Sequence, residues 1–177
     1  MLQVRDGDVR KLGILFDRYS GRLLSFFHRH TNRPGISEDL VQDVFLRILK
    51  YRQTFRGEAP FTVWMYQLAR NVSADHFRKR REQVSADGTV LEEHQDPDPI
   101  SSDALQRKEE HELLARALAN LPHEKREVLI LSRFQELKYE DIGKILDCPV
   151  GTVKARVHFA LKDLRSEYMK LSGMEHK

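Results

Sequence analysis

The sequence predicts an all-α fold made of two small helical domains joined by a flexible acidic linker. Apolar residues recur at intervals of three and four along most of the 177-residue chain, which is the spacing of amphipathic helices. β-Branched alternation is nowhere sustained, so strands are not expected. A stretch rich in Asp, Pro, Ser and Glu interrupts the helical pattern. We therefore predict helical domains over 1–84 and 105–177, with a linker over 85–104.

Charge follows the same division. The net charge is +7 over residues 1–84, −7 over 85–112 and +3 over 113–177. Two basic parts joined by an acidic strip indicate two modules that bind a polyanion and a connector that avoids it. No apolar run approaches the roughly 20 residues that cross a bilayer, and the charged N-terminus lacks a signal-peptide segment. We expect a cytoplasmic protein without membrane insertion.

Three helices are predicted before the linker, over Val9–His30, 38–51 and Pro60–Arg80. Each has an apolar face that can be buried against the other two. Ser37 is a good N-cap for the second helix, because its hydroxyl can accept a first-turn N–H. The opposite face of this helix remains polar and exposed, with Asp39, Gln42, Asp43, Arg47 and Lys50.

The third helix and the loop before it combine basic, amide and aromatic side chains. The helix ends in the run Arg78-Lys79-Arg80-Arg81, and aromatic residues flank the loop at Phe55 and Phe61. Basic groups hold a phosphate backbone, and aromatic faces stack on bases with about 1–3 kcal/mol each. A solvated basic helix end is the alternative for the run. The hydrophobic core is the alternative for the aromatic residues, and we expect Trp64 to belong to it.

A helix-turn-helix is predicted near the end of the chain, after helices over 104–121 and 123–134. Its first helix covers Tyr139–Leu146, the turn is "DCPVG", and Thr152 caps the second helix. An inner apolar stripe is predicted at Val153, Val157, Ala160, Leu161 and Leu164. The outward side chains of the opening turns would then reach DNA base edges. Many helical hairpins with a glycine corner never touch DNA, so that alternative stays open.

Three motifs in this order resemble those of sigma factors of the extracytoplasmic-function (ECF) class, in the sigma-70 family. The motif "EDLVQDVFLRI" resembles the segment that docks on the β′ clamp helices of RNA polymerase. "FRGEAPFTVWMYQLARNVSADHFRKRRE" resembles the segment that opens and reads the promoter minus-ten element. "LANLPHEKREVLILSRFQELKYEDIGKILDCPVGTVKARVHFALKDL" resembles the module that reads the minus-thirty-five element.

The resemblance implies three groups of site residues. The polymerase-binding residues would be Asp39, Gln42, Asp43 and Arg47. The minus-ten residues would be Phe55, Arg56, Phe61, Arg70, Asn71, Asp75, Arg78, Lys79, Arg80 and Arg81. The minus-thirty-five residues would be Thr152, Lys154, Ala155, Arg156, His158 and Phe159. Phe159, Leu161 and Ala155 depart from the family, which often has cations or polar groups at these positions.

The resemblance also implies the partners: core RNA polymerase through its β′ clamp helices and β flap, promoter DNA, and an anti-sigma factor. We expect no cofactor, no metal site and no catalytic residue, because the eight His residues show no metal-ligand spacing and no catalytic motif occurs. The main alternative is a stand-alone helix-turn-helix regulator, although no dimerisation helix is evident. A protein-protein adaptor is a further alternative that would not need the basic surfaces.

Overall fold

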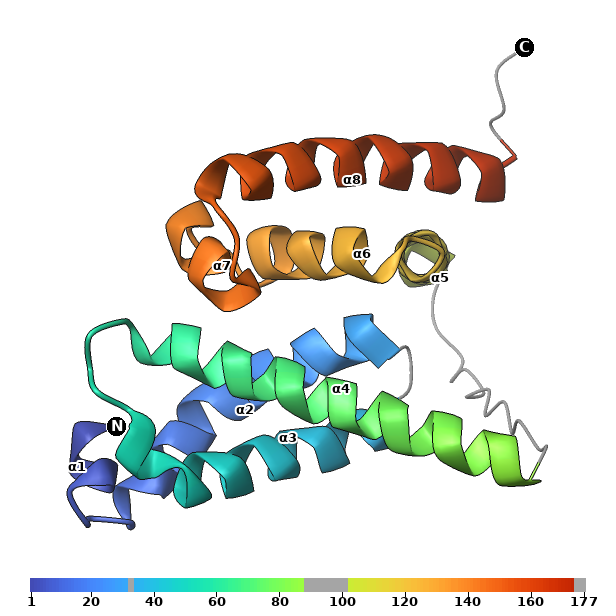
Figure 1. Ribbon diagram of the computed structural model, residues 1–177. Helices are drawn as coiled ribbons and strands as arrows, with labels where there is room; N and C mark the ends of the chain where they lie inside the picture. The colour runs from blue at the N-terminus through green and yellow to red at the C-terminus, as the bar shows by residue number, and fades with distance from the viewer. Residues whose placement is uncertain (32–33, 88–101, 174–177) are drawn as a thin grey trace.

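Two layers of helices make up the computed structural model, which describes residues 1–31, 34–87 and 102–173 (Figure 1). The N-terminal bundle contains α1 (Leu2–Arg5), α2 (Lys11–Thr31), α3 (Pro34–Lys50), the 3-10 turn η1 (Arg52–Thr54) and α4 (Phe61–Asp87). The C-terminal bundle contains α5 (Ser102–Ala119), α6 (His123–Leu129), the π-helical turn η2 (Ile130–Phe134), α7 (Tyr139–Leu146) and α8 (Val150–Leu171). No strand occurs in these ranges, and the predicted all-α fold is confirmed.

Each bundle buries the apolar faces of its own helices. In the N-terminal bundle the packed faces belong to α2, α3 and α4, with Leu23, Phe26, Val44, Ile48, Met65 and Tyr66 fully buried. In the C-terminal bundle α6 and α7 pack against α8, with Leu129, Ile142, Val153 and Ala160 fully buried. Full burial of a Val, Leu, Ile, Phe or Met side chain stabilises a fold by about 1.5–3 kcal/mol. The hydrophobic effect therefore holds both bundles together.

The two bundles also pack against each other through α2 and α4 on one side and α7 and η2 on the other (Figure 1). Their buried apolar residues form one continuous cluster. At its centre Tyr66 Oη donates a 2.6 Å hydrogen bond to Oε1 of the buried Gln135. Burial raises the pKa of Tyr66 to about 12, so the phenol stays protonated and remains a donor. The sequence alone did not indicate this packing of the bundles.

Two local predictions need correction. Ser37 does not cap the second helix, because α3 begins at Pro34 and Ser37 is a fully buried residue within it. The Ser37 Oγ lies 3.2 Å from Thr31 Oγ1. The third helix continues beyond Arg80 to Asp87, because no proline or glycine interrupts it before Gly88. It therefore extends into the segment predicted as linker, most of which lies outside the described residues.

The corner between α7 and α8 depends on two backbone positions. Asp147 adopts the left-handed conformation, with φ 52° and ψ 53°, directly after α7. The chain then turns back so closely that a Cβ added to Gly143 would lie 2.8 Å from the carbonyl oxygen of Cys148. Glycine is thus required within α7 by the close approach of the turn.

Gly143→Ala is expected to lower the free energy of unfolding by about 1–3 kcal/mol, because backbone atoms of the turn have to move. Urea denaturation followed by circular dichroism measures this change. The matched control is Gly151→Ala in the first turn of α8, where an added Cβ meets nothing within 4 Å. The control should be neutral or more stable by up to about 1 kcal/mol, since alanine favours helix. Equal stability of the two variants would contradict the close approach.

Candidate functional site

The exposed face of α3 carries most of the predicted polymerase-binding residues. Asp39, Gln42 and Asp43 are exposed at positions one turn apart on this face. Leu46, one turn further along the helix, has an exposed fraction of 63%. Sequence reasoning missed Leu46, although an apolar residue next to a polar stripe was a usable signal. The face thus combines acidic groups with one large apolar side chain.

Arg47, the fourth predicted polymerase residue, is engaged elsewhere. Its Nη2 lies 2.7 Å from Oδ2 of Asp75 on α4, and Arg78 Nη2 lies 2.8 Å from the other carboxylate oxygen. The hydrogen bond from Arg47, with the nearby positive charges, holds the pKa of Asp75 below its usual value. Asp75 is therefore a carboxylate that links α3 to the basic end of α4.

The aromatic residues before and within α4 form a packed group. Phe55 is buried, and its ring centroid lies 6.0 Å from that of Phe61 and 5.4 Å from that of Trp64. Arg56 is exposed beside them. The hollow at this end of the bundle is lined by Met1, Leu2, Gln3, Phe55, Gly57 and Phe61. Phe55 and Trp64 both contribute to this packing, as expected for Trp64.

The predicted minus-ten residues of α4 divide between two faces. Asn71, Arg78 and Lys79 are exposed to solvent. The side chains of Arg80 and Arg81 lie outside the described residues, although the helix itself continues through them.

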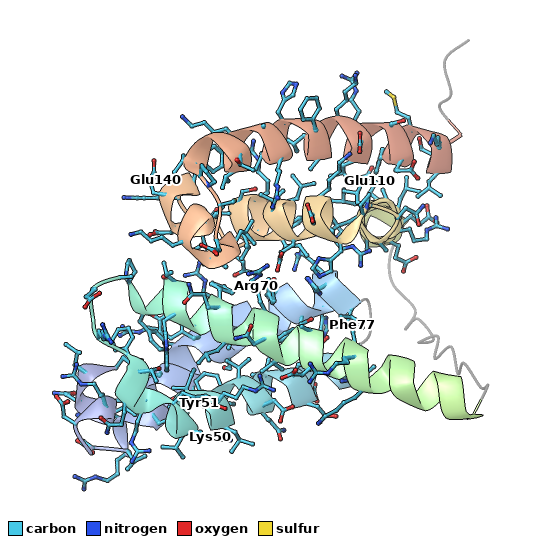
Figure 2. The ribbon with its side chains drawn as sticks, viewed as in Figure 1. Lys50, Tyr51, Arg70, Phe77, Glu110 and Glu140 are labelled. Atoms are coloured by element: carbon cyan, nitrogen blue, oxygen red, sulfur yellow. The ribbon has the colours of Figure 1, made fainter. Side chains whose placement is uncertain are left out.

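Arg70 instead points between the two bundles (Figure 2). Its Nε donates to Oε1 of Glu127 on α6 at 2.7 Å, and its Nη1 donates to the Ile145 carbonyl oxygen at 2.7 Å. The Glu127 side chain is almost completely buried, so Arg70 neutralises a buried carboxylate. In this arrangement the guanidinium of Arg70 is occupied and does not face solvent with Asn71.

A histidine lies beside this ion pair. His30 at the end of α2 is buried, and its ring centroid is 4.8 Å from that of His123 on α6. Burial lowers the pKa of His30 to about 3, with smaller contributions from His123 and two neighbouring arginines. The imidazole is therefore neutral at neutral pH. Sequence reasoning assigned no function to either histidine, because neither has a second histidine at the usual metal-ligand spacing along the chain.

The opening turns of α8 present a mixed surface. Lys154, Ala155, His158 and Phe159 are exposed, and Phe159 has an exposed fraction of 55%. Arg156 is half-buried, with Nη2 3.5 Å from Oε2 of Glu124. These side chains occupy the outward face of the helix that follows the corner.

Two predictions about α8 are wrong. The helix begins at Val150, with Pro149 at the N-cap position, so the half-buried Thr152 lies inside the first turn and does not cap it. Leu161 is exposed and does not belong to the inner stripe, whereas Val153, Val157 and Ala160 are buried as predicted.

Comparison with known proteins identifies the family. Residues 15–83 match Sigma-70 region 2, and residues 111–164 match Sigma-70, region 4. The chain is 30% identical over 163 residues to the RNA polymerase sigma-H factor of Pseudomonas aeruginosa, covering 88% of this chain and 84% of that protein. The chain belongs to the sigma-70 family. Within it, the relatives place the chain in the ECF class.

Other relatives of this sigma-70 family member cover nearly its whole length. It is 29% identical to the ECF RNA polymerase sigma-E factor of Haemophilus influenzae, over 96% of this chain and 93% of that one. Among solved structures it resembles the sigma factor RpoE of Bartonella quintana, in complex with the anti-sigma factor NepR, with a TM-score of 0.72 and 25% identity. That match covers 94% of this chain and 99% of the other.

The region 2 match covers most of α2, all of α3 and most of α4, and the region 4 match ends within α8. The exposed α3 face and the aromatic group therefore lie in sigma-70 region 2, and the α7–α8 corner lies in region 4. The Arg70–Glu127 pair joins region 2 to region 4. No helix in the described ranges is long and apolar enough to span a membrane.

Proposed function

We propose that this chain is an alternative sigma factor that binds core RNA polymerase and directs promoter-specific transcription initiation. The observation that carries the proposal is the presence of both region 2 and region 4 in one chain that aligns with sigma factors over most of its length. Its work is binding in the cytoplasm, with no covalent step and no cofactor.

The roles follow the two bundles. Residues 1–84 dock on the β′ clamp helices and recognise and melt the minus-ten element. Residues 105–177 contact the β flap and read the minus-thirty-five element, and 85–104 connect them. The exposed Asp39, Gln42 and Asp43 support the docking role, because a charged, accessible face suits a protein partner. Tethering both modules to one polymerase raises their effective concentration, so neither needs high affinity for DNA alone.

The proposed DNA contacts divide in the same way. We propose that Asn71, Arg78 and Lys79 on α4 contact the melted strand, which their exposure supports. On α8, Lys154 and His158 would enter the major groove beside the apolar Phe159, and all three side chains are exposed. Arg70 and Arg156 become available only after their ion pairs with Glu127 and Glu124 break.

An anti-sigma factor is proposed as a further partner. The sigma factor RpoE of similar fold was solved with its anti-sigma factor NepR. Exposed apolar side chains such as Leu46, Phe159 and Leu161 suit such a partner, because burying them from water is favourable.

The proposal is tested by mixing the purified chain with sigma-free core RNA polymerase and measuring run-off transcription from promoter DNA. Initiation from one defined start that depends on the added chain is the expected result. Binding to duplex operator DNA without polymerase, together with no initiation, would overturn the proposal in favour of a stand-alone regulator.

Lys154→Ala combined with Arg156→Ala is expected to reduce use of promoters with a minus-thirty-five element by about tenfold or more. Each lost cation removes a phosphate or base contact and lowers the salt dependence of binding. Run-off transcription at several salt concentrations measures this loss, and binding to core polymerase should stay unchanged.

The matched control for this pair is Lys170→Ala, a lysine near the other end of the same helix. Lys154 and Lys170 are about 24 Å apart along the helix, at 1.5 Å per residue. Lys170→Ala should leave promoter selectivity unchanged. Unchanged selectivity of the double variant would mean that α8 does not read the upstream element.

A further inference from the structure

Three potential metal ligands meet where the two bundles touch. They are His30 in the last turn of α2 and His123 and Glu127 on α6, and one ligand atom from each lies within 4.8 Å of the other two. His123 and Glu127 are four residues apart, which places them on one face of a helix. Sequence spacing could not reveal this group, because His30 is far from the other two along the chain.

The burial and hydrogen bonding of His30 resemble those of a metal-bound histidine. Its side chain is buried, with an exposed fraction of 3%, and its Nδ1 lies 3.3 Å from Ser73 Oγ. Among the described residues its Nε2 has no hydrogen-bond partner, which is unusual for a buried polar atom. Metal-bound histidines usually donate the second ring N–H to a neighbouring group. With the proton on Nδ1 and Ser73 as acceptor, Nε2 is the ring nitrogen whose lone pair is left for an ion.

Glu127 can bind an ion without giving up its arginine partner. A carboxylate has two oxygens with about four lone-pair positions, and Arg70 Nε uses one position on Oε1. Carboxylate ligands of metals are commonly hydrogen-bonded in this way. Arg126 also lies close by, with its Nη1 bonded to the His30 carbonyl oxygen. The charges of the two arginines repel a cation, so binding should be weaker than at a structural site with four ligands.

The ligand set selects the kind of ion. Two imidazole nitrogens and one carboxylate suit zinc and related transition metals, whereas magnesium and calcium prefer oxygen ligands. Zinc–nitrogen bonds of about 2.0–2.1 Å need ligand atoms about 3.3 Å apart in a tetrahedral site. The three ligand atoms lie within 4.8 Å of one another, and the exposed His123 side chain is free to move toward the other two. We propose that His30, His123 and Glu127 form a site for a zinc-class divalent ion between the two bundles.

The site has a structural consequence because its ligands come from both bundles. An ion bound to all three stabilises the packed arrangement over any arrangement in which the bundles separate. The contact between the bundles also engages two side chains of α4. Gln67 Nε2 donates to the Lys144 carbonyl oxygen, and Arg70 Nη1 donates to the Ile145 carbonyl oxygen. Zinc would therefore oppose promoter use by keeping α4 against the C-terminal bundle; this regulatory part rests on the proposed function.

The test uses the full-length chain, stripped of metal, and zinc itself as the probe. Isothermal titration should show one zinc ion per chain, and zinc should raise the melting temperature as its concentration increases. His123→Ala should weaken binding at least tenfold and remove the thermal shift. His123 is exposed, so this variant should fold normally, as circular dichroism will check. Magnesium should produce neither effect.

Two controls separate this site from other zinc ligands. His158→Ala removes an exposed histidine on α8, and Cys148→Ser removes the single thiol; both should bind zinc like the parent chain. The site is overturned if no stoichiometric binding occurs, if His123→Ala binds as tightly as the parent, or if either control loses binding.

The regulatory part has a separate readout. Zinc should reduce run-off transcription by the parent chain more than by His123→Ala. Zinc binding with no such difference would overturn the regulatory part while supporting the site. Absence of initiation without zinc would instead count against the proposed function.

Discussion

Arg70→Met is expected to lower the free energy of unfolding by about 2–4 kcal/mol. The substitution leaves the Glu127 carboxylate buried without its ion-pair partner and removes the donor to the Ile145 carbonyl oxygen. Breaking a buried ion pair typically costs about 3–5 kcal/mol. Arg70 retains one third of its side-chain exposure, so solvent screening reduces that figure. Urea denaturation in the presence of a chelator measures the change without any contribution from bound metal.

The double variant Arg70→Met with Glu127→Leu distinguishes charge burial from general damage. Removing both charges should recover part of the lost stability, because no buried charge is left unpaired. Arg78→Met is the matched control, since Arg78 is largely exposed and should cost less than about 1 kcal/mol. A double variant no more stable than Arg70→Met would contradict the role assigned to the pair.

Asp39→Arg combined with Asp43→Arg is expected to weaken binding to core RNA polymerase at least 100-fold. Both side chains are exposed on the face of α3 proposed to dock on the polymerase. Reversing their charge would put like charges opposite each other across that interface, which costs several kcal/mol. Association is measured with labelled chain and core polymerase at moderate ionic strength. Circular dichroism should show an unchanged helical fold, because neither residue is part of the core.

A variant with the same change of charge elsewhere controls for net charge. Glu109→Arg with Glu110→Arg alters two exposed residues of α5 and should leave polymerase binding within about twofold. Figure 2 labels Glu110. If the α3 variant still binds like the parent, the docking face is misplaced. If both variants lose binding equally, the effect comes from overall charge and the α3 face has no special role.

Local patterns predicted most of the helices, and the two bounds of α7 at Tyr139 and Leu146 agree with the structure. Periodicity and turn residues are short-range signals, so they serve well for elements of this kind. Helix ends were less predictable. The basic run at Arg78 looked like a terminus, but α4 continues to Asp87 because charge alone does not break a helix.

The contact between the bundles could not be predicted from the sequence. Arg70 is 57 residues from Glu127, and Tyr66 is 69 residues from Gln135. No periodicity relates positions so far apart, and each residue has an ordinary alternative role within its own helix. Arg70 in particular fits a DNA-binding helix by its position on α4, and only its surroundings reveal a second role.

The close spacing of Arg70 and Asn71 on α4 constrains how this chain can diverge. Arg70 faces the second bundle, and Asn71 faces solvent. A substitution at Asn71 that changes promoter choice is therefore adjacent in sequence to a residue of a buried ion pair. Descendants that exchange Arg70 would need a compensating exchange at Glu127, and the two positions should covary across lineages. New promoter preferences would then arise more readily at Asn71 and beyond, where no such linked change is required.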